Sequence, residues 1–308
     1  MAEVLYDSPY EVHDPRFAKL INPGAKLERL ATGFRWAEGP AYFPAQRRLI
    51  WSDIPNNRMM SWNEVDGSVA EFRNPSDNCN GHTIDRQGRL VSCSHLRRAV
   101  IRTEHDGSTT VIADSYQGGR LNSPNDVVEH SDGSIWFTDP SYGIDTDYEG
   151  ARSDREQNGC HVYRVDAATG EVSRVADDFE RPNGLAFSID EKKLYIADSG
   201  RTHGEDLPHH IRVFDVVEGK TLKGGEVFAV CEPGFFDGFR LDEQGNIWTS
   251  AGDGVQCFAP DGTLIGKIKL PEGCANVCFG MLRNDRLFMT ATTSVYAIYL
   301  LVRGHRTF

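Results

Sequence analysis

The chain has 308 residues, a formal net charge of −12 at pH 7, and 39% hydrophobic and 25% charged residues, which is ordinary for a water-soluble globular protein. The acidic charge argues against nucleic acid as a partner, because a phosphate backbone attracts basic patches. No run approaches the roughly 18 apolar residues of a membrane helix. The N-terminal segment also lacks the basic start and apolar stretch of a signal peptide. We therefore expect a cytoplasmic protein that does not bind a membrane.

Short segments rich in β-branched and aromatic residues recur along the chain and are separated by Asp-Gly and Asn-Gly type turns. In chain order they include RLIWSDI, GSIWFTD, HVYRVDAATG, KKLYIAD, IRVFDVVEG and GNIWTSA. Long helical periodicity is absent. Evenly spaced short strands of this kind are typical of a sandwich, a barrel or a propeller.

A short segment of the same kind precedes each cluster of strands. It contains a polar residue with a side-chain oxygen, followed by apolar residues. The six polar residues are Glu38, Asn80, Asn125, Asn183, Asp237 and Asn276. Their separations of 42, 45, 58, 54 and 39 residues match the size of a four-stranded blade. The sequence therefore predicts an all-β, six-bladed propeller with four-stranded antiparallel blades.

The last repeat lacks one strand. After Asn276 only three strand-like segments fit, ANVCFG, RLFMTA and SVYAIYL, so we expect KLERLAT, near the N-terminus, to supply the fourth. That pairing closes the ring and removes exposed sheet edges. We predict a single domain over residues 1–308, with residues 1–25 as a strap on its surface. Nothing in the pattern predicts an oligomeric state.

The equivalent polar residues are expected at one end of the central channel, because the innermost strand of each blade runs along the axis. Six converging oxygens are costly to bury without a partner, and a hard cation would satisfy them. Calcium takes oxygen ligands, whereas zinc prefers His and Cys, which occupy no ring position. The two acids, Glu38 and Asp237, match a divalent charge. Asn and Asp before Gly are also common turn residues, so the prediction depends on all six being in register.

The cysteines give no competing metal or disulfide signal. There are seven, without the spacing of a disulfide framework, and the pair in CANVC is Cys-x3-Cys. We interpret them as buried free thiols. The sequence also contains no G-x-S-x-G elbow, no H-E-x-x-H, no P-loop and no G-x-G-x-x-G motif.

A cation with open positions can polarise a carbonyl or phosphoryl oxygen and activate water. Asp237 is the candidate catalytic group, because its FFDGF surroundings are apolar and should raise its pKa. Whether it acts as base, as nucleophile or only as a ligand stays open. We expect the substrate to contact Asn80, Asn125, Asn276, His82, His95 and Tyr142, with Arg97 and His203 as further candidates on the rim loops. His82 is included because it follows Asn80 by two residues on the same strand.

The segments AEGPAYF, SPNDVV followed by GSIWFTDPSYG, RPNGLAFS and FFDGFRLDEQGNIW resemble the senescence marker protein (SMP-30)/gluconolactonase/LRE-like family, from about Phe34 onward. The resemblance implies a six-bladed propeller that hydrolyses sugar lactones with calcium or another divalent cation. It also implies metal ligands at Glu38, Asn125, Asn183 and Asp237, with Asp237 as general base and Asn125 contacting metal or substrate. Ser123 stands where the animal branch carries a substrate-contacting Arg, which weakens any transfer of that branch's sugar preference.

Three functions fit this pattern. The first is a metal-dependent lactonase acting on a small lactone. The second is a phosphotriesterase resembling diisopropyl fluorophosphatase, which shares the propeller and a similar ligand set. The third is a non-catalytic propeller that binds a protein partner. A ring of buried acids and amides argues against the third, and the sequence does not separate the first two.

Overall fold

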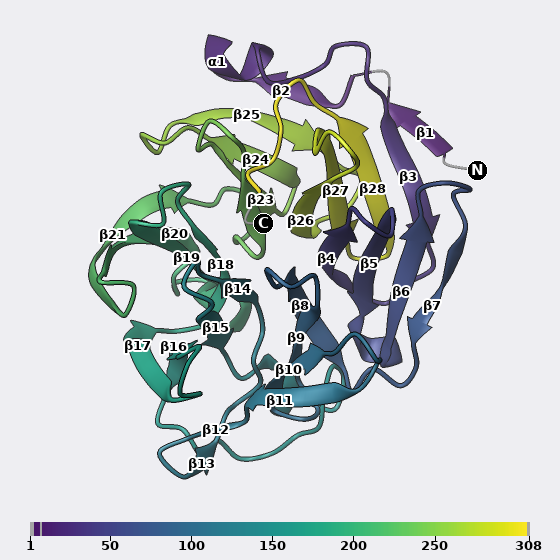
Figure 1. The fold of residues 1–308 in the computed structure, drawn as a ribbon. Coiled ribbons are helices and arrows are strands. Elements are labelled where there is room, and N and C mark those ends of the chain that lie inside the picture. Colours follow the sequence, from purple (N-terminus) through teal and green to yellow (C-terminus); the bar gives the residue numbers. More distant parts are fainter. Residues whose placement is uncertain (1–2, 7, 307–308) are drawn as a thin grey trace.

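The computed structural model describes residues 3–6 and 8–306. Six antiparallel sheets follow one another around a central axis in chain order (Figure 1). The prediction of a six-bladed, all-β propeller is therefore confirmed. Among the described residues, no helix has the length and apolar character needed to cross a membrane.

Each blade has four strands, ordered from the axis outward. Blade 1 contains β4 (Ala37–Phe43), β5 (Arg48–Asp53), β6 (Arg58–Asn63) and β7 (Val69–Arg73). Blade 2 contains β8 (Cys79–Ile84), β9 (Leu90–Ser94), β10 (Ala99–Thr103) and β11 (Thr109–Ala113). Blade 3 contains β14 (Val127–Glu129), β15 (Ile135–Asp139), β16 (Cys160–Val165) and β17 (Val172–Phe179).

The second half of the ring repeats this order. Blade 4 contains β18 (Pro182–Phe187), β19 (Lys193–Asp198), β20 (His210–Val217) and β21 (Thr221–Val230). Blade 5 contains β22 (Phe239–Leu241), β23 (Ile247–Ala251), β24 (Gly254–Phe258) and β25 (Leu264–Lys269). Blade 6 contains β26 (Cys274–Gly280), β27 (Arg286–Ala291), β28 (Ser294–Tyr299) and β3 (Leu27–Thr32). The connections hold β12 (Ser115–Tyr116), β13 (Gly119–Arg120), the helix α2 (Tyr142–Asp145) and the 3₁₀ turns η1 (Ile54–Asn56) and η2 (Gly200–His203).

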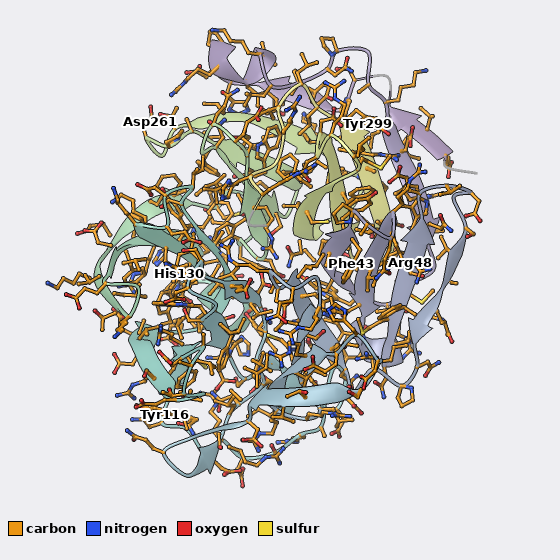
Figure 2. The ribbon with its side chains drawn as sticks, viewed as in Figure 1. Phe43, Arg48, Tyr116, His130, Asp261 and Tyr299 are labelled. Carbon is orange, nitrogen blue, oxygen red and sulfur yellow. The ribbon has the colours of Figure 1, made fainter. Side chains whose placement is uncertain are left out.

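The core lies between the blades, where side chains crowd the space separating neighbouring sheets (Figure 2). Second strands such as β15 are buried at every residue, which explains their nearly continuous apolar sequences. Aromatic pairs join adjacent blades. The rings of Tyr42 and Phe288 stack at 5.7 Å between blades 1 and 6, and Trp136 meets Phe187 edge-on at 5.5 Å between blades 3 and 4. All seven cysteines are buried and free.

The ring closes through the N-terminal strand that the sequence predicted. β3 pairs antiparallel with β28, with Thr32 opposite Ser294 and Glu28 opposite Ala297. Figure 1 shows this purple strand beside the yellow end of the chain.

The segment before β3, expected as a surface strap, adds strands to two blades. β1 (Glu3–Tyr6) pairs with β3, and β2 (Tyr10–Val12) pairs with β25. Between them and β3, the helix α1 (Pro15–Ala18) buries Phe17 completely, with its ring 5.7 Å from that of Trp248. Residues 1–2 and 7 lie outside the described part of the chain. The added strands cover the outer edges of blades 5 and 6, which would otherwise be open.

Candidate active site

The six polar residues predicted to form a ring lie at the axial start of the innermost strands. They are all buried, with exposed fractions of 2% for Glu38, 4% for Asn80, 6% for Asn125, 3% for Asn183, 9% for Asp237 and 2% for Asn276. Four lie within β4, β8, β18 and β26, and the other two lie two residues before the start of β14 and of β22. The structure thus places one of them in each blade, at the same level of the channel.

Four of these residues are followed by glycine, and the glycines bring neighbouring inner strands into contact. A Cβ on Gly39 would lie 2.1 Å from the carbonyl oxygen of Asn80, and one on Gly238 would lie 1.9 Å from Cγ of Asn276. No side chain fits at those separations. The glycine of one blade therefore packs against the ring residue of the next blade, which fixes the spacing of the ring.

The pairing of the inner strand with the second strand shifts beside the ring residue in four blades. The shifts lie between Glu38 and Ala41, Cys79 and His82, Pro182 and Leu185, and Cys274 and Asn276. Such bulges re-aim side chains and interrupt the alternation of a strand. The side chains of these ring residues therefore have directions that the alternation of a regular strand would not give them.

An aspartate at the end of the second strand anchors the entry to the inner strand in three blades. These aspartates, Asp53, Asp139 and Asp198, are 0%, 0% and 2% exposed. Asp53 accepts from the amide of Arg35 (2.9 Å), Asp139 from those of Asn122 and Ser123 (2.9 Å each), and Asp198 from those of Glu180 (3.0 Å) and Arg181 (2.9 Å). In each of these blades the aspartate carboxylate binds backbone amides that lie within three residues of a ring residue. We therefore interpret these three buried carboxylates as groups that position the ring residues.

The carboxylates of the ring share one poorly solvated space. Burial raises the pKa of Glu38, and the nearby charge of Asp126 raises it further. Burial also raises the pKa of Asp237 well above its usual range, with Glu38 and Asp126 adding to the effect. Asn276 donates to Glu38 Oε2 at 3.0 Å, and the Asn183 amide hydrogen-bonds to Asp237. The amides therefore stabilise the two acids without cancelling their charge.

Several oxygens in this space lack a hydrogen-bond partner. Within the described part of the chain, they include Oδ1 of Asn80, Oδ1 of Asn183 and Oδ2 of Asp126. Unpaired buried oxygens are expensive, and oxygen ligands are what calcium and magnesium prefer. Across residues 3–6 and 8–306, no group of three or more His, Cys, Asp or Glu side chains is arranged for a metal. The donor set of acids and amides thus fits a hard divalent cation and not zinc.

His95 holds the side chain of Asn80. It is fully buried, with Nε2 3.2 Å from Nδ2 of Asn80 and Nδ1 3.0 Å from the carbonyl oxygen of Glu149. Burial lowers the pKa of His95 to about 4, so the ring is neutral at neutral pH. Its Nδ1 then donates to the carbonyl, and its Nε2 accepts from the amide. His95 therefore orients Asn80 and leaves Oδ1 of that residue free.

His82 has no free ring nitrogen. Its Nε2 lies 2.8 Å from Oγ of Ser52 and its Nδ1 2.8 Å from Oγ of Ser92, between blades 1 and 2. Burial lowers its pKa to about 3. The structure therefore places His82 in a structural contact between two blades, where neither nitrogen is available to a substrate.

Tyr142 lies on the long loop of blade 3, beside the loop of blade 4. Its hydroxyl is 3.0 Å from Oγ1 of Thr202, and its ring centroid is 5.5 Å from that of His203. Burial raises the pKa of Tyr142, and the charge of Asp237 contributes in the same direction. Tyr142 and His203 thus lie side by side on the rim, with Tyr142 close enough to Asp237 to be affected by its charge. Arg97 instead pairs with the Asp77 carboxylate on the surface, at 2.6 Å.

Two acids near the ring were not among the predicted site residues. Asp126 follows Asn125 directly and is 1% exposed, and its place in PNDVV was visible in the sequence. Glu149 comes from the loop after α2, and its side chain is 28% exposed, with Oε2 3.6 Å from Nδ1 of His95. Burial raises the pKa of Glu149 to about 7. No sequence signal apart from the length of its loop pointed to Glu149.

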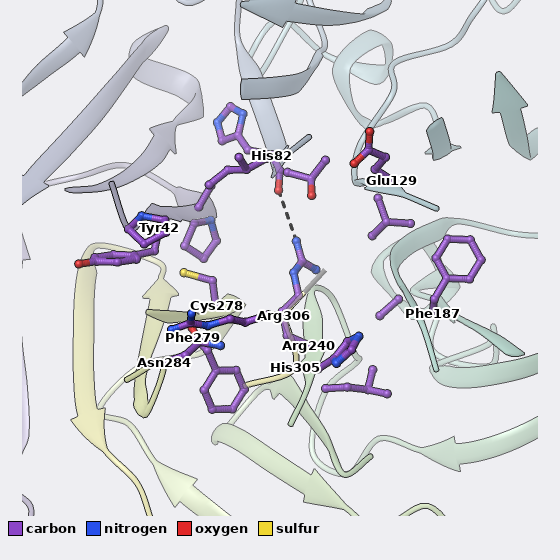
Figure 3. A pocket seen from close by; sticks show the side chains of 18 of the residues that line it. Tyr42, His82, Glu129, Phe187, Arg240, Cys278, Phe279, Asn284, His305 and Arg306 are labelled. Atoms are coloured by element: carbon purple, nitrogen blue, oxygen red, sulfur yellow. Dashed lines mark hydrogen bonds between the residues drawn. The ribbon is translucent and has the colours of Figure 1, made fainter. Parts of the chain in front are cut away.

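A cavity of about 230 Å³ lies at the opposite end of the channel, where the inner strands finish (Figure 3). Its acids are already paired. Glu129 accepts from the amide of Arg86 at 2.8 Å, and Glu191 lies 3.4 Å from Nε2 of His130. Arg240 reaches into this cavity, and its Nη2 donates to the carbonyl oxygen of His82 at 3.4 Å. The side-chain oxygens of Asn80 and Asn183 that lack a hydrogen-bond partner are at the other end, which we take as the candidate active site.

The fold and this site define a six-bladed propeller with a ring of buried acids and amides on its axis. A model of the SMP-30/gluconolactonase/LRE-like region matches residues 36–293, and the chain belongs to that family. A gluconolactonase from Zymomonas mobilis is 30% identical over 303 residues, covering 92% of this chain and 84% of that protein. A pentonolactonase from Haloferax volcanii is 28% identical over 269 residues, covering 84% and 82%.

A solved gluconolactonase structure from Xanthomonas campestris shares the fold closely. It is 35% identical, covers 97% of each chain and superposes with a TM-score of 0.90.

Proposed function

We propose that this protein hydrolyses a small, sugar-type lactone, and that it does so with one divalent cation, calcium being the first expectation. The similarity to gluconolactonases and a pentonolactonase supports the reaction class. The observation that carries the cation is the pair of buried acids, Glu38 and Asp237, beside amide oxygens without a partner. Glu38, Asn125, Asn183 and Asp237 would hold it. When bound, it would polarise the lactone carbonyl.

Asp237 is the residue to accept the proton of the attacking water. Its apolar burial raises its pKa, which makes it a stronger base than a solvated aspartate. The Asn183 amide that hydrogen-bonds to it fixes the carboxylate in place. Water then adds to the carbonyl carbon, the ring C–O bond breaks, and the departing oxygen takes a proton to give a hydroxy acid. Tyr142 would offer its hydroxyl to the substrate's hydroxyls, whereas both ring nitrogens of His203 already bond within the protein, to Oγ1 of Thr202 at 2.8 Å and to Oδ2 of Asp145 at 3.1 Å.

A substrate panel tests the reaction class. Turnover of aldonolactones of five and six carbons is measured beside a fluorophosphate ester, with and without a chelator. We expect lactone hydrolysis that the chelator abolishes and an added divalent cation restores. Hydrolysis of the fluorophosphate alone would contradict the proposal in favour of a phosphotriesterase. Lactone turnover that survives chelation would contradict the role of the cation.

Two substitutions separate the roles of the acids. Asp237→Asn keeps the size and one oxygen but removes the base, so turnover should fall roughly 10²–10⁴-fold with the cation still bound. Glu38→Gln should first weaken cation binding, and excess cation should partly restore activity. Asp261→Asn, on an exposed turn 2.8 Å from Arg16, is the matched control and should leave both unchanged. A loss of activity in Asp237→Asn that only follows lost metal would show that Asp237 is a ligand without a catalytic role.

A further inference from the structure

Arg240 lines the far cavity, and its guanidinium extends toward the backbone of His82 (Figure 3). It lies on β22, three residues after Asp237. Its Nη1 donates to the carbonyl oxygen of Phe239 at 2.7 Å, and its Nη2 to that of His82 at 3.4 Å. The same Nη1 is 3.6 Å from Oδ2 of Asp126, and the Arg240 side chain is only 20% exposed. Backbone carbonyls from two blades thus hold the guanidinium facing that carboxylate.

Asp126 depends on this ion pair. Its Oδ1 accepts from the amide of Val127 at 2.8 Å. Its Oδ2 has no hydrogen-bond partner in the described part of the chain, and the residue is 1% exposed. A buried carboxylate without a counter-charge is strongly unfavourable. Burial raises the pKa of Asp126, and the charge of the facing Arg240 guanidinium lowers it.

The pair also acts on the two acids of the ring. The charge of Asp126 raises the pKa of both Glu38 and Asp237, and the charge of Arg240 lowers the pKa of Glu38. The four groups therefore share one electrostatic environment. When all three carboxylates are ionised, they and the guanidinium together leave two negative charges, which equals the charge that one divalent cation brings.

We propose that Arg240 is the internal counter-ion of the site and that, paired with Asp126, it sets the net charge that the ring presents to its cation. This inference rests on the cation proposed above. It gives Arg240 and Asp126 a positioning and charge-balancing role, not a role in contact with the substrate. The two residues should then matter as a pair, because removing either one alone changes the charge of the site.

The test is a double-mutant cycle on cation binding, which does not depend on turnover. Chelator-treated wild type, Asp126→Asn, Arg240→Met and the double variant are titrated with Ca²⁺ by calorimetry, and bound metal is measured directly. Asp126→Asn leaves an unopposed guanidinium facing the ring, and at the effective dielectric of a partly buried site it should weaken Ca²⁺ binding about tenfold or more. Adding Arg240→Met should restore most of that loss, because the two substitutions then remove opposite charges.

Arg86→Met is the matched control. Arg86 lies 3.8 Å from Glu129, an acid that lines the far cavity. Its substitution removes the same charge and the same kind of side chain away from the Asp126 pair and should leave the Ca²⁺ affinity unchanged. If Arg240→Met alone does not fold, the double variant still carries the test, because replacing both charges of a buried pair is often neutral for stability.

Three results would count against the inference. A double variant that binds Ca²⁺ as weakly as Asp126→Asn would overturn it, and so would an Asp126→Asn variant with wild-type affinity. Wild-type protein that binds none of Ca²⁺, Mg²⁺, Mn²⁺ and Zn²⁺ would overturn the proposed cation site and this inference together, which distinguishes the two failures.

Discussion

Replacing Gly238 by alanine probes the contact that sets the spacing of the ring. An alanine Cβ would lie 1.9 Å from Cγ of Asn276, although ordinary contact begins at 3.4 Å. Asn276 cannot move aside freely, because its Oδ1 accepts from the amide of Val277 at 2.8 Å and its Nδ2 donates to Glu38 at 3.0 Å. The side chain or the inner strand of blade 6 must shift.

The cost has two parts. Overpacking a buried position costs about 1–3 kcal/mol, and losing the hydrogen bond to the Glu38 carboxylate costs about 1.5–3 kcal/mol. A total of about 2.5–6 kcal/mol should lower Tm by roughly 4–9 °C in a protein of this size. Because Glu38 loses its amide partner, the affinity for a divalent cation should fall as well.

Thermal unfolding followed by circular dichroism, together with Ca²⁺ calorimetry, measures both effects. Gly24→Ala is the control, since the nearest atom to its Cβ would be Oδ1 of Asn22 at 3.6 Å. A Gly238→Ala protein with wild-type Tm and cation affinity would refute the idea that this glycine sets the geometry of the ring.

Two further predictions concern pH and chain closure. In chelator, folded protein binds protons at Glu38 and Asp237 more readily than unfolded protein does, because burial raises the pKa of both. The free energy of unfolding that this proton binding contributes is therefore fully present below the unfolded pKa of about 4.5. It is lost as pH rises toward about 8, where the pKa of Glu38 lies in the folded protein. Melting curves with and without Ca²⁺ should show that added Ca²⁺ raises Tm more at pH 8 than at pH 5. A protein in chelator whose Tm does not fall between pH 5 and pH 8 would contradict this prediction. Deleting the chain up to Thr32 removes β1, β2 and β3 and opens the edges of β28 and β25. Open strand edges pair with other molecules, so light scattering should detect aggregation of the truncated protein. A truncated protein with full thermal stability would contradict the role of β3 in closing the ring.

Much of the fold could be predicted because each blade carries one ring residue at a regular spacing. Glu38 and Asn276 marked the first and last blades, and the missing strand after Asn276 pointed to β3. The strands β1 and β2 could not be predicted in the same way. They are only four and three residues long, too short to show an alternating pattern, and they form because the outer edges of blades 5 and 6 are available to pair.

The candidate site was predictable to a smaller extent. The alternation of a regular strand places His82 on the same side as Asn80, but the bulge between Cys79 and His82 breaks that relation. His82 therefore packs between two serines. Arg240 carried no sequence signal, because its partner Asp126 lies in another blade and only the closed ring brings them within 3.6 Å.

The buried aspartates Asp53, Asp139 and Asp198 separate, in their three blades, the backbone that positions the ring residue from the loop that can vary. In blades 3 and 4 the long rim loops begin directly after Asp139 and Asp198, while the clamped backbone leads back to Asn125 and Asn183. Insertions, deletions or exchanges in residues 140–159 and 199–209 that keep the Glu149 carbonyl, which holds His95, should therefore reshape the mouth of the channel without displacing the ring. Such a division lets one catalytic centre be adapted to new substrates by changing loops alone, and it marks these two segments as the places to engineer specificity.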